Sequence, residues 1–363
     1  MSEFEVDRRK FGMVALGAAA TGIAASSAAA QLPGPSAVDD PTALPIPAQR
    51  IPVPKSLSNE AQAFLTAAHR RIAAIQAGGK TAGGGVPGAG QASMETILQY
   101  LRPGAARFKG TTETIDLGHG AKLYRFIPDG RKGRRAQVAY FDIHGGGFTA
   151  GGGEMCKLLA QARSADFGVE VYAVDYRLIP DHPYPAPLDD CMAAYREALK
   201  SHKPADLVVA GSSAGGNLVA AMLLRARDEC LPLPVALVLL TPALDMLSAG
   251  DSHQTNKYLD VNLYANAGVG QLYAKGQDPT HPYLSPLFGD YSRGWPPTLL
   301  ATGTRDLLLS DSVRMHRILR RAGIRADLHV TEAGGHGGFL GRAPEDTEIL
   351  AECRRFMDAA WRI

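Results

Sequence analysis

The chain has 363 residues, of which 45% are hydrophobic and 20% are charged, so it can bury a large core in one α/β domain with an accessory piece. This composition excludes a chain that is disordered throughout, and a formal net charge of +2 gives no indication of a nucleic-acid partner. The 4 cysteines are far apart and no pair has metal-ligand spacing, so we expect no metal site. The sequence assigns no disulfide, although one is an alternative, and the default is free buried thiols at Cys156, Cys191, Cys230 and Cys353.

The first 30 residues resemble a twin-arginine export signal. Arg8 and Arg9 precede a weakly apolar, alanine-rich run over residues 13–24, and residues 28–30 offer small side chains for cleavage. The alternative is a membrane anchor, but the run is short and rich in Ala, Gly and Ser for a bilayer span. We therefore expect residues 1–30 to be a signal peptide, no stable membrane span, and a protein that is periplasmic or secreted.

The next segment combines an extended arm with two helices. Residues 31–55 are too rich in proline for a helix or a central strand and are expected to form an arm. A helical pattern begins at Ser58, a glycine-rich linker follows over 78–90, and a second short helix is expected over 94–101. We assign residues 56–105 to N-terminal cap helices and their linker. The Gly79-Lys80-Thr81 sequence lacks the earlier glycine and the preceding strand of a phosphate-binding loop, so no nucleotide cofactor is expected.

From residue 106 onward, short apolar strands alternate with helical patterns. This alternation predicts an α/β fold with a mostly parallel central sheet, helices on both faces, and an active site at the carboxyl ends of the strands. An insertion over about 246–286 interrupts it and is expected to form a cap with the helices before Arg102, although an ordinary surface excursion is the alternative. The basic cluster at 131–135 is interpreted as a solvated loop. The expected strands cover 112–117, 122–127, 138–143, 169–174, 207–210, 235–240, 298–301 and 327–330, and the expected helices lie near 155–165, 188–199, 217–224, 312–321 and 348–361.

A Gly-X-Ser-X-Gly sequence sits at the centre of this alternation. Gly211-Ser212-Ser213-Ala214-Gly215 follows the strand at 207–210 and precedes a helix, which is the arrangement that exposes a nucleophilic serine on a strained turn. The motif alone also arises by chance in a chain with 40 glycines. On the functional interpretation Ser213 is the nucleophile, and the amide of Ala214 points to the position of an oxyanion.

A serine nucleophile requires a base and a carboxylate that orients the base. His336 lies in a glycine-rich loop after the last expected strand, and Asp306 follows the strand at 298–301, so both are expected at the same edge of the sheet. The alternatives are a structural loop histidine and a surface ion pair. Asp311 is the second candidate for the acid, although capping of the following helix explains it better.

A second glycine-rich segment follows the strand at 138–143. In Asp142-Ile143-His144-Gly145-Gly146-Gly147-Phe148, consecutive glycines allow backbone amides to approach a substrate without obstruction by side chains. We expect His144 to brace this loop rather than to act as a base. The alternative is a packing role for the glycines.

Together these motifs resemble the hormone-sensitive lipase family of α/β-hydrolases, in its bacterial esterase branch, over roughly residues 95–360. The resemblance implies the α/β-hydrolase fold, a triad of Ser213, Asp306 and His336, and an oxyanion hole of Gly146, Gly147 and Ala214. Two departures leave the subfamily and substrate open: Ser212 stands where the family often has Asp, and Ile179-Pro180-Asp181 stands where Ala-Pro-Glu is usual. The motifs that carry the resemblance also include Asp175-Tyr176-Arg177-Leu178, Pro180 and Pro185-Ala186, in which Asp175 and Arg177 are interpreted as structural.

The sequence thus predicts a cofactor-free serine esterase that acts on short or medium acyl esters through an acyl-enzyme. Side chains that could line the substrate pocket, or could equally be packing residues, are Phe148, Tyr258, Tyr264 and Phe339. Alternatives are a lactone, amide or polyester hydrolase with the same triad, and a non-catalytic ligand receptor on the same fold, as in the plant gibberellin receptors, which lack the histidine. The expected partner is a small-molecule ester, and the oligomeric state stays open.

Overall fold

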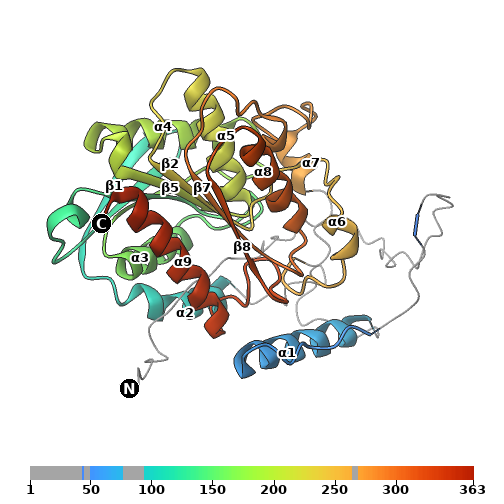
Figure 1. Cartoon of the computed structure of the whole chain (residues 1–363). Coiled ribbons are helices and arrows are strands. Elements are labelled where there is room, and N and C mark those ends of the chain that lie inside the picture. The colour runs from blue at the N-terminus through green and yellow to red at the C-terminus, as the bar shows by residue number, and fades with distance from the viewer. Residues whose placement is uncertain (1–42, 45–49, 77–93, 264–268) are drawn as a thin grey trace.

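One sheet of 8 strands, in the order β1-β2-β4-β3-β5-β6-β7-β8, runs through the molecule in the computed structural model (Figure 1). The structure describes residues 43–44, 50–76, 94–263 and 269–363. The expected signal peptide, most of the expected arm and the glycine-rich linker lie outside the described residues. The strands are β1 (Gly110–Gly118), β2 (Ala121–Pro128), β3 (Ala139–Ile143), β4 (Glu170–Asp175), β5 (Leu207–Ser212), β6 (Ala236–Leu240), β7 (Thr298–Gly303) and β8 (Ala326–Thr331).

The adjacent strands β4, β3, β5, β6, β7 and β8 are parallel, and β1 and β2 form an antiparallel extension at one edge of the sheet. The central strands β3, β5 and β6 are buried on both faces, as expected for apolar runs in a parallel sheet. Parallel pairing brings the carboxyl ends of β5, β7 and β8 to one edge. The expected α/β architecture is therefore confirmed.

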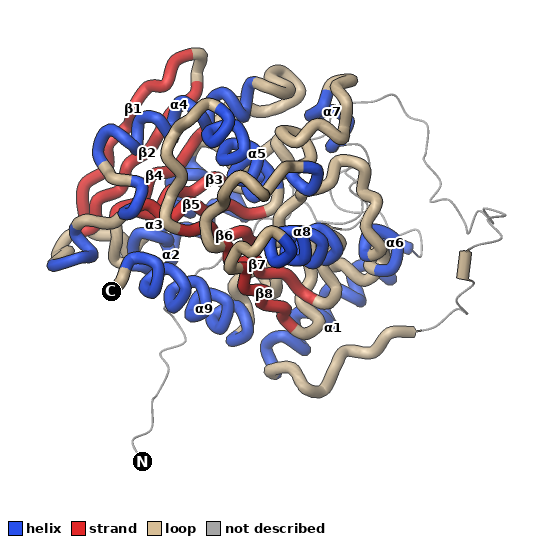
Figure 2. Tube along the Cα trace, turned by 45° about the horizontal axis from the view of Figure 1, so that its top comes forward, coloured by secondary structure: helices blue, strands red, loops and turns tan. Residues whose placement is uncertain are grey.

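Helices cover both faces of this sheet (Figure 2). Alternate residues of β3 and β5 pack in opposite directions: Phe141 and Val209 join the cluster that includes α4 and α5, whereas Tyr140 and Val208 join the cluster that includes α3 and α9. The helices are α1 (Asn59–Gln76), α2 (Met94–Ala105), α3 (Glu154–Phe167), α4 (Ala186–Ser201), α5 (Ala214–Asp228), α6 (Ser252–Thr255), α7 (Val269–Ala274), α8 (Leu309–Arg321) and α9 (Pro344–Trp361), with short 3-10 turns η1 (Gly133–Ala136), η2 (Pro204–Asp206) and η3 (Pro286–Phe288). No helix within the described ranges has the length and apolar character needed to cross a bilayer.

The N-terminal helices make different contacts. The apolar face of α1 packs on Val261, from the chain between β6 and β7, and on Phe339, after β8, with the Phe64 and Phe339 rings 5.8 Å apart and edge to face. Helix α2 packs instead against α3, where Leu98 and Leu101 meet Met155 and Leu159.

Two details differ from the sequence-based expectations. Cys230 is exposed rather than buried, because it follows α5 in a surface turn, whereas the other cysteines are buried and all are free thiols. Asp311 does not cap α8: it lies inside that helix, and its buried carboxylate accepts the amides of Leu244 and Asp245, at 2.7 and 3.2 Å, from the segment after β6.

The basic cluster at 131–135 is largely paired, through ion pairs of Arg131 with Glu170, Arg134 with Asp206 and Arg135 with Asp358.

Candidate active site

Ser213 lies on the sharp turn between β5 and α5. Its backbone has φ 54° and ψ −121°, a conformation that costs a non-glycine residue of order 1–3 kcal/mol. Close packing fixes the turn against the glycine-rich loop after β3. A Cβ atom on Gly215 would lie 2.0 Å from the carbonyl oxygen of Ile143, and one on Gly145 would lie 3.2 Å from the Ser213 Cβ. Glycine at these two positions therefore allows the serine turn and the loop to touch.

The side chains of Ser213, His336 and Asp306 form one hydrogen-bonded chain. Ser213 Oγ lies 2.9 Å from His336 Nε2, and His336 Nδ1 lies 3.1 Å from Asp306 Oδ1. The histidine and aspartate are fully buried and the serine is nearly so. Residues from the ends of β5, β7 and β8 are thus in contact, as the sequence predicted from their positions after these strands.

The Asp306 carboxylate is itself held by other groups. Its Oδ2 accepts the Thr302 hydroxyl at 2.7 Å, and its Oδ1 accepts the Leu308 amide at 2.9 Å. Burial lowers the pKa of His336, but the hydrogen bond and the charge of Asp306, together with the charge of Asp260, outweigh burial, so this pKa lies above the ordinary 6.5. The surroundings therefore favour an imidazole that readily accepts a proton.

Three backbone amides near Ser213 are free to bind a ligand. Within the described residues, no acceptor receives the N–H of Gly146, Gly147 or Ala214. Gly146 and Gly147 have φ values of 117° and 59°, and Ala214 is the first residue of α5, where N–H groups lack intrahelical partners. These are the donors that an oxyanion hole requires.

His144 braces the glycine-rich loop. Its ring stacks on Tyr176 at 4.2 Å between centroids, and its Nδ1 lies 2.8 Å from the Gly145 carbonyl oxygen. Burial lowers the pKa of His144, so the ring is kept neutral. The Tyr176 hydroxyl donates to the His144 carbonyl at 3.0 Å, which ties the loop to the segment after β4.

Asp175 and Arg177 have structural partners. Asp175 accepts the Tyr124 hydroxyl at 2.7 Å and the Gly153 amide at 3.0 Å. Arg177 forms a bidentate pair with Asp190 of α4, with its Nη2 2.7 Å from Oδ1. Neither belongs to the group around Ser213.

The aromatic residues suggested for the pocket lie in different surroundings. Phe148 is buried and stacks on Tyr273 of α7 with 3.9 Å between the ring centroids. Phe339 is fully buried under α1, the position of a packing residue, whereas Tyr258 is 57% exposed. Tyr264 lies outside the described residues.

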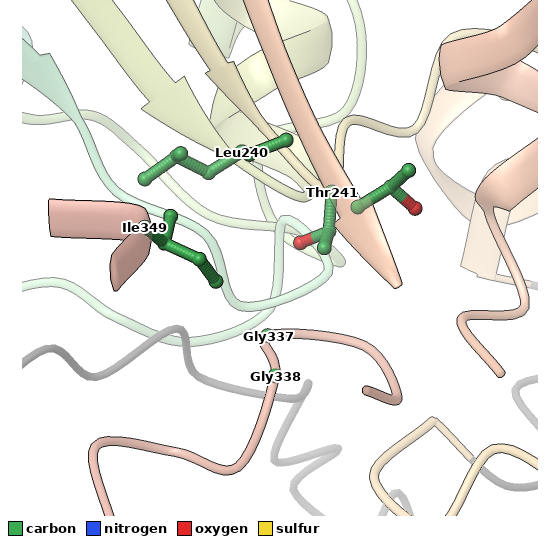
Figure 3. A pocket seen from close by; sticks show the side chains of 7 residues that line it. Leu240, Thr241, Gly337, Gly338 and Ile349 are labelled. Atoms are coloured by element: carbon green, nitrogen blue, oxygen red, sulfur yellow. The ribbon is translucent and has the colours of Figure 1, made fainter. Parts of the chain in front are cut away.

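A small pocket lies between the ends of β6 and β7 and the loop that carries His336 (Figure 3). The Thr241 hydroxyl beside it is buried and has no partner in the described structure. No charged side chain lines the pocket, and the described residues contain no group of three or more potential metal ligands. Its lining consists of Leu240, Thr241, Ala301, Thr302, Gly337, Gly338 and Ile349.

Three polar residues near the site did not stand out in the sequence. Asn256, Asp260 and Asn262 lie in the chain segment that connects β6 to β7. All three are buried and bind the backbone of the loops that carry Asp306 and His336. Their spacing matches no motif. The only signal was the polar content of a segment that proves to be buried, and sequence alone does not reveal burial.

The comparisons with known proteins agree with this geometry. A family model described as the α/β hydrolase fold matches residues 140–340. An esterase of Acinetobacter venetianus is 32% identical over 222 residues, which cover 60% of this chain and 73% of that protein.

Solved structures match over most of the chain. The crystal structure of an esterase, E25, is 30% identical with a TM-score of 0.75, and the match covers 88% of this chain and 98% of that one. An esterase from the bacterial hormone-sensitive lipase family is 27% identical with a TM-score of 0.67, covering 84% and 99%. The fold, the family model and these relatives together establish that the chain belongs to the hormone-sensitive lipase family of α/β-hydrolases.

Proposed function

We propose that this protein is a serine carboxylesterase that hydrolyses short or medium acyl esters, with Ser213 as the nucleophile. The observation that carries the proposal is the hydrogen-bonded chain from Ser213 through His336 to Asp306 beside free backbone amides. The names of the relatives support the same reaction, since the similar proteins reported above are esterases.

Each group has a distinct part in the reaction. His336 Nε2 takes the proton of the Ser213 hydroxyl as its oxygen attacks the ester carbonyl, and Asp306 stabilises the imidazolium that forms. The amides of Gly146, Gly147 and Ala214 bind the developing oxyanion. The imidazolium then gives its proton to the leaving alcohol, which leaves the acyl group on Ser213.

Hydrolysis of the acyl-enzyme repeats these steps with water. His336 takes a proton from the attacking water molecule, the same amides bind the second oxyanion, and the proton returns to Ser213 as the carboxylic acid leaves. Every proton moves between groups already named.

A panel of p-nitrophenyl esters of increasing acyl length tests this proposal. We expect turnover by the wild type that is greatest for short or medium chains, and a loss of about 10³-fold or more in Ser213→Ala. Ser164→Ala is a matched control: the Ser164 hydroxyl is also buried, but it donates to the carbonyl of Val169, between α3 and β4, and this variant should retain activity.

Equal turnover by the wild type and Ser213→Ala would refute the serine mechanism. Turnover of lactones, amides or polyesters, without turnover of the p-nitrophenyl esters, would show that the same triad acts on a different class of substrate. Absence of turnover on all these panels, together with tight binding of an ester, would favour the alternative that the protein is a non-catalytic ligand receptor.

We also propose that residues 1–30 direct export by the twin-arginine route, to the periplasm or the cell exterior. The order of paired arginines, apolar run and small residues in the sequence supports this proposal. Residues 1–35 fused to a reporter should export it, and export should stop when Arg8 and Arg9 are both changed to Lys. Undiminished export of the double variant would contradict the proposal.

A further inference from the structure

Asp260 is a fully buried carboxylate between the two loops that carry the triad acid and base. Its Oδ1 accepts the amides of Asn262 and Leu263, each at 2.9 Å, and its Oδ2 accepts the Leu307 amide at 2.8 Å. Both oxygens also lie near the His336 amide, at 3.2 and 3.1 Å. The carboxylate therefore bridges the residue after Asp306 to the backbone of His336 itself.

Two asparagines of the same short segment complete this bridge. Asn262 Nδ2 donates to the carbonyls of His336 and Gly338, both at 2.9 Å. Asn256 Nδ2 donates to the carbonyls of Thr304 and Asp306, at 3.2 and 2.9 Å. The 256–262 segment thus binds the main chain of both loops, and His336 is held at its amide by Asp260 and at its carbonyl by Asn262.

The charge on Asp260 acts on the imidazole as well. Among the described residues, the charged groups that act on the buried imidazole are Asp306 from the loop after β7 and Asp260 from the 256–262 segment, and the Ser213 hydroxyl of the β5–α5 turn is its other hydrogen-bond partner. Burial raises the pKa of Asp260 above its ordinary 3.8 and the charge of Asp306 raises it further, whereas the charge of His336 and the amide donors offset only part of this rise. The amide donors are matched to the ionised form, which can only accept hydrogen bonds.

We propose that Asp260 and Asn262 are positioning residues for the proposed esterase: they hold His336 at hydrogen-bond distance from both Ser213 and Asp306, and Asp260 supplies a second negative charge to the imidazolium. This inference rests on the proposed function, because it assigns the two residues to the same triad. Neither side chain contacts Ser213, so both act through His336 and the acid loop.

Asp260→Asn tests the charge. The substitution keeps the size of the side chain but removes the anion, so the pKa of His336 should fall and the acid limb of kcat/KM should move to lower pH by about 1 unit. Asn262→Ala tests the geometry alone. It should lower kcat by about 10- to 100-fold at every pH, with the acid limb unmoved, because a displacement of about 1 Å suffices for such a loss.

Asp346→Asn is the matched control. Asp346 is also a buried carboxylate that accepts backbone amides, those of Phe339 at 2.9 Å and Ala343 at 3.3 Å, but it belongs to α9 and is not among the groups that affect the imidazole. This variant should lose thermal stability and keep the acid limb of the wild type. A shift in Asp260→Asn no larger than that in Asp346→Asn would overturn the role of the charge.

Sulfonylation of Ser213 by phenylmethanesulfonyl fluoride separates failure of this inference from failure of the proposed function. The reagent requires an activated serine but no ester substrate, and Ser213→Ala identifies the labelled residue by mass. A wild type that neither hydrolyses esters nor reacts at Ser213 removes both claims. A wild type that reacts, with the same pH dependence of labelling in Asp260→Asn, removes only the inference. If Asp260→Asn does not fold, wild-type kcat in Asn262→Ala overturns the positioning role.

Discussion

Replacement of Gly215 by alanine should separate the serine turn from the glycine-rich loop. In the structure, a Cβ atom at this position would lie 2.0 Å from the Ile143 carbonyl oxygen and 2.5 Å from that of His144. Non-bonded heavy atoms pack at about 3.5 Å, so the two segments would have to move apart by about 1.5 Å. Both contacts are with backbone atoms, which no change of side-chain rotamer relieves.

The cost to activity follows from this displacement. The free amides of Gly146 and Gly147 belong to the loop that would move away from Ser213, and a misplacement of about 1 Å can cost about 10²-fold in rate. We therefore expect kcat to fall by about 10²-fold or more. Overpacking of this kind costs about 1–3 kcal/mol of stability, and the better helix propensity of alanine returns about 1 kcal/mol.

Steady-state kinetics on a p-nitrophenyl ester, together with thermal unfolding, check this prediction. Gly323→Ala is the control for a glycine without close neighbours: no atom lies within 4 Å of the added Cβ, although the positive φ of Gly323, 76°, disfavours alanine, and the residue lies in a turn after α8. Gly323→Ala should lose some stability and keep kcat. A folded Gly215→Ala with wild-type kcat would refute the argument that this contact sets the distance between the nucleophile and the amides.

Three further predictions concern the acid, a buried charge and the N-terminal helix. Asp306→Asn removes the main group that raises the pKa of His336 and that orients its Nδ1, so kcat should fall by about 10⁴-fold and the acid limb should move to lower pH; an unmoved limb would contradict this. Burial raises the pKa of Asp142 from 3.8 to about 6, so its ionised form is disfavoured in the fold, and Asp142→Asn should stabilise the protein by up to about 3 kcal/mol at pH 8. This gain should fade as the pH drops through 6 toward 4, and a gain independent of pH in urea unfolding would exclude burial of the charge as its cause. Leu65→Ala leaves a cavity between α1 and the 331–343 loop and should lower the free energy that holds α1 in place by about 2–4 kcal/mol. Limited proteolysis should then cleave α1 earlier than in the wild type, and unchanged cleavage would show that Leu65 does not hold α1 on the domain.

The parallel sheet and the triad could be predicted from local patterns. The short apolar, β-branched run at 207–210 is bounded by a turn signal and indicates a strand, and the glycines around Ser213 indicate the sharp turn that follows it. His336 and Asp306 follow strands, and parallel strands end at one edge, so their contact followed from topology alone. These features were predictable because each follows from a short stretch of chain and one general rule.

The residues around the triad could not be predicted in this way. Asn256, Asp260 and Asn262 belong to the insertion expected to form a cap and are not singled out by the sequence, and Asp311 is interpreted from the sequence as a helix cap, yet all four are buried and bind the backbone of distant segments. The value of a buried hydrogen bond depends on which donor faces which acceptor after folding, and that pairing has no local period. The chain itself thus determined which groups can react, whereas tertiary packing decided which polar side chains hold them in place.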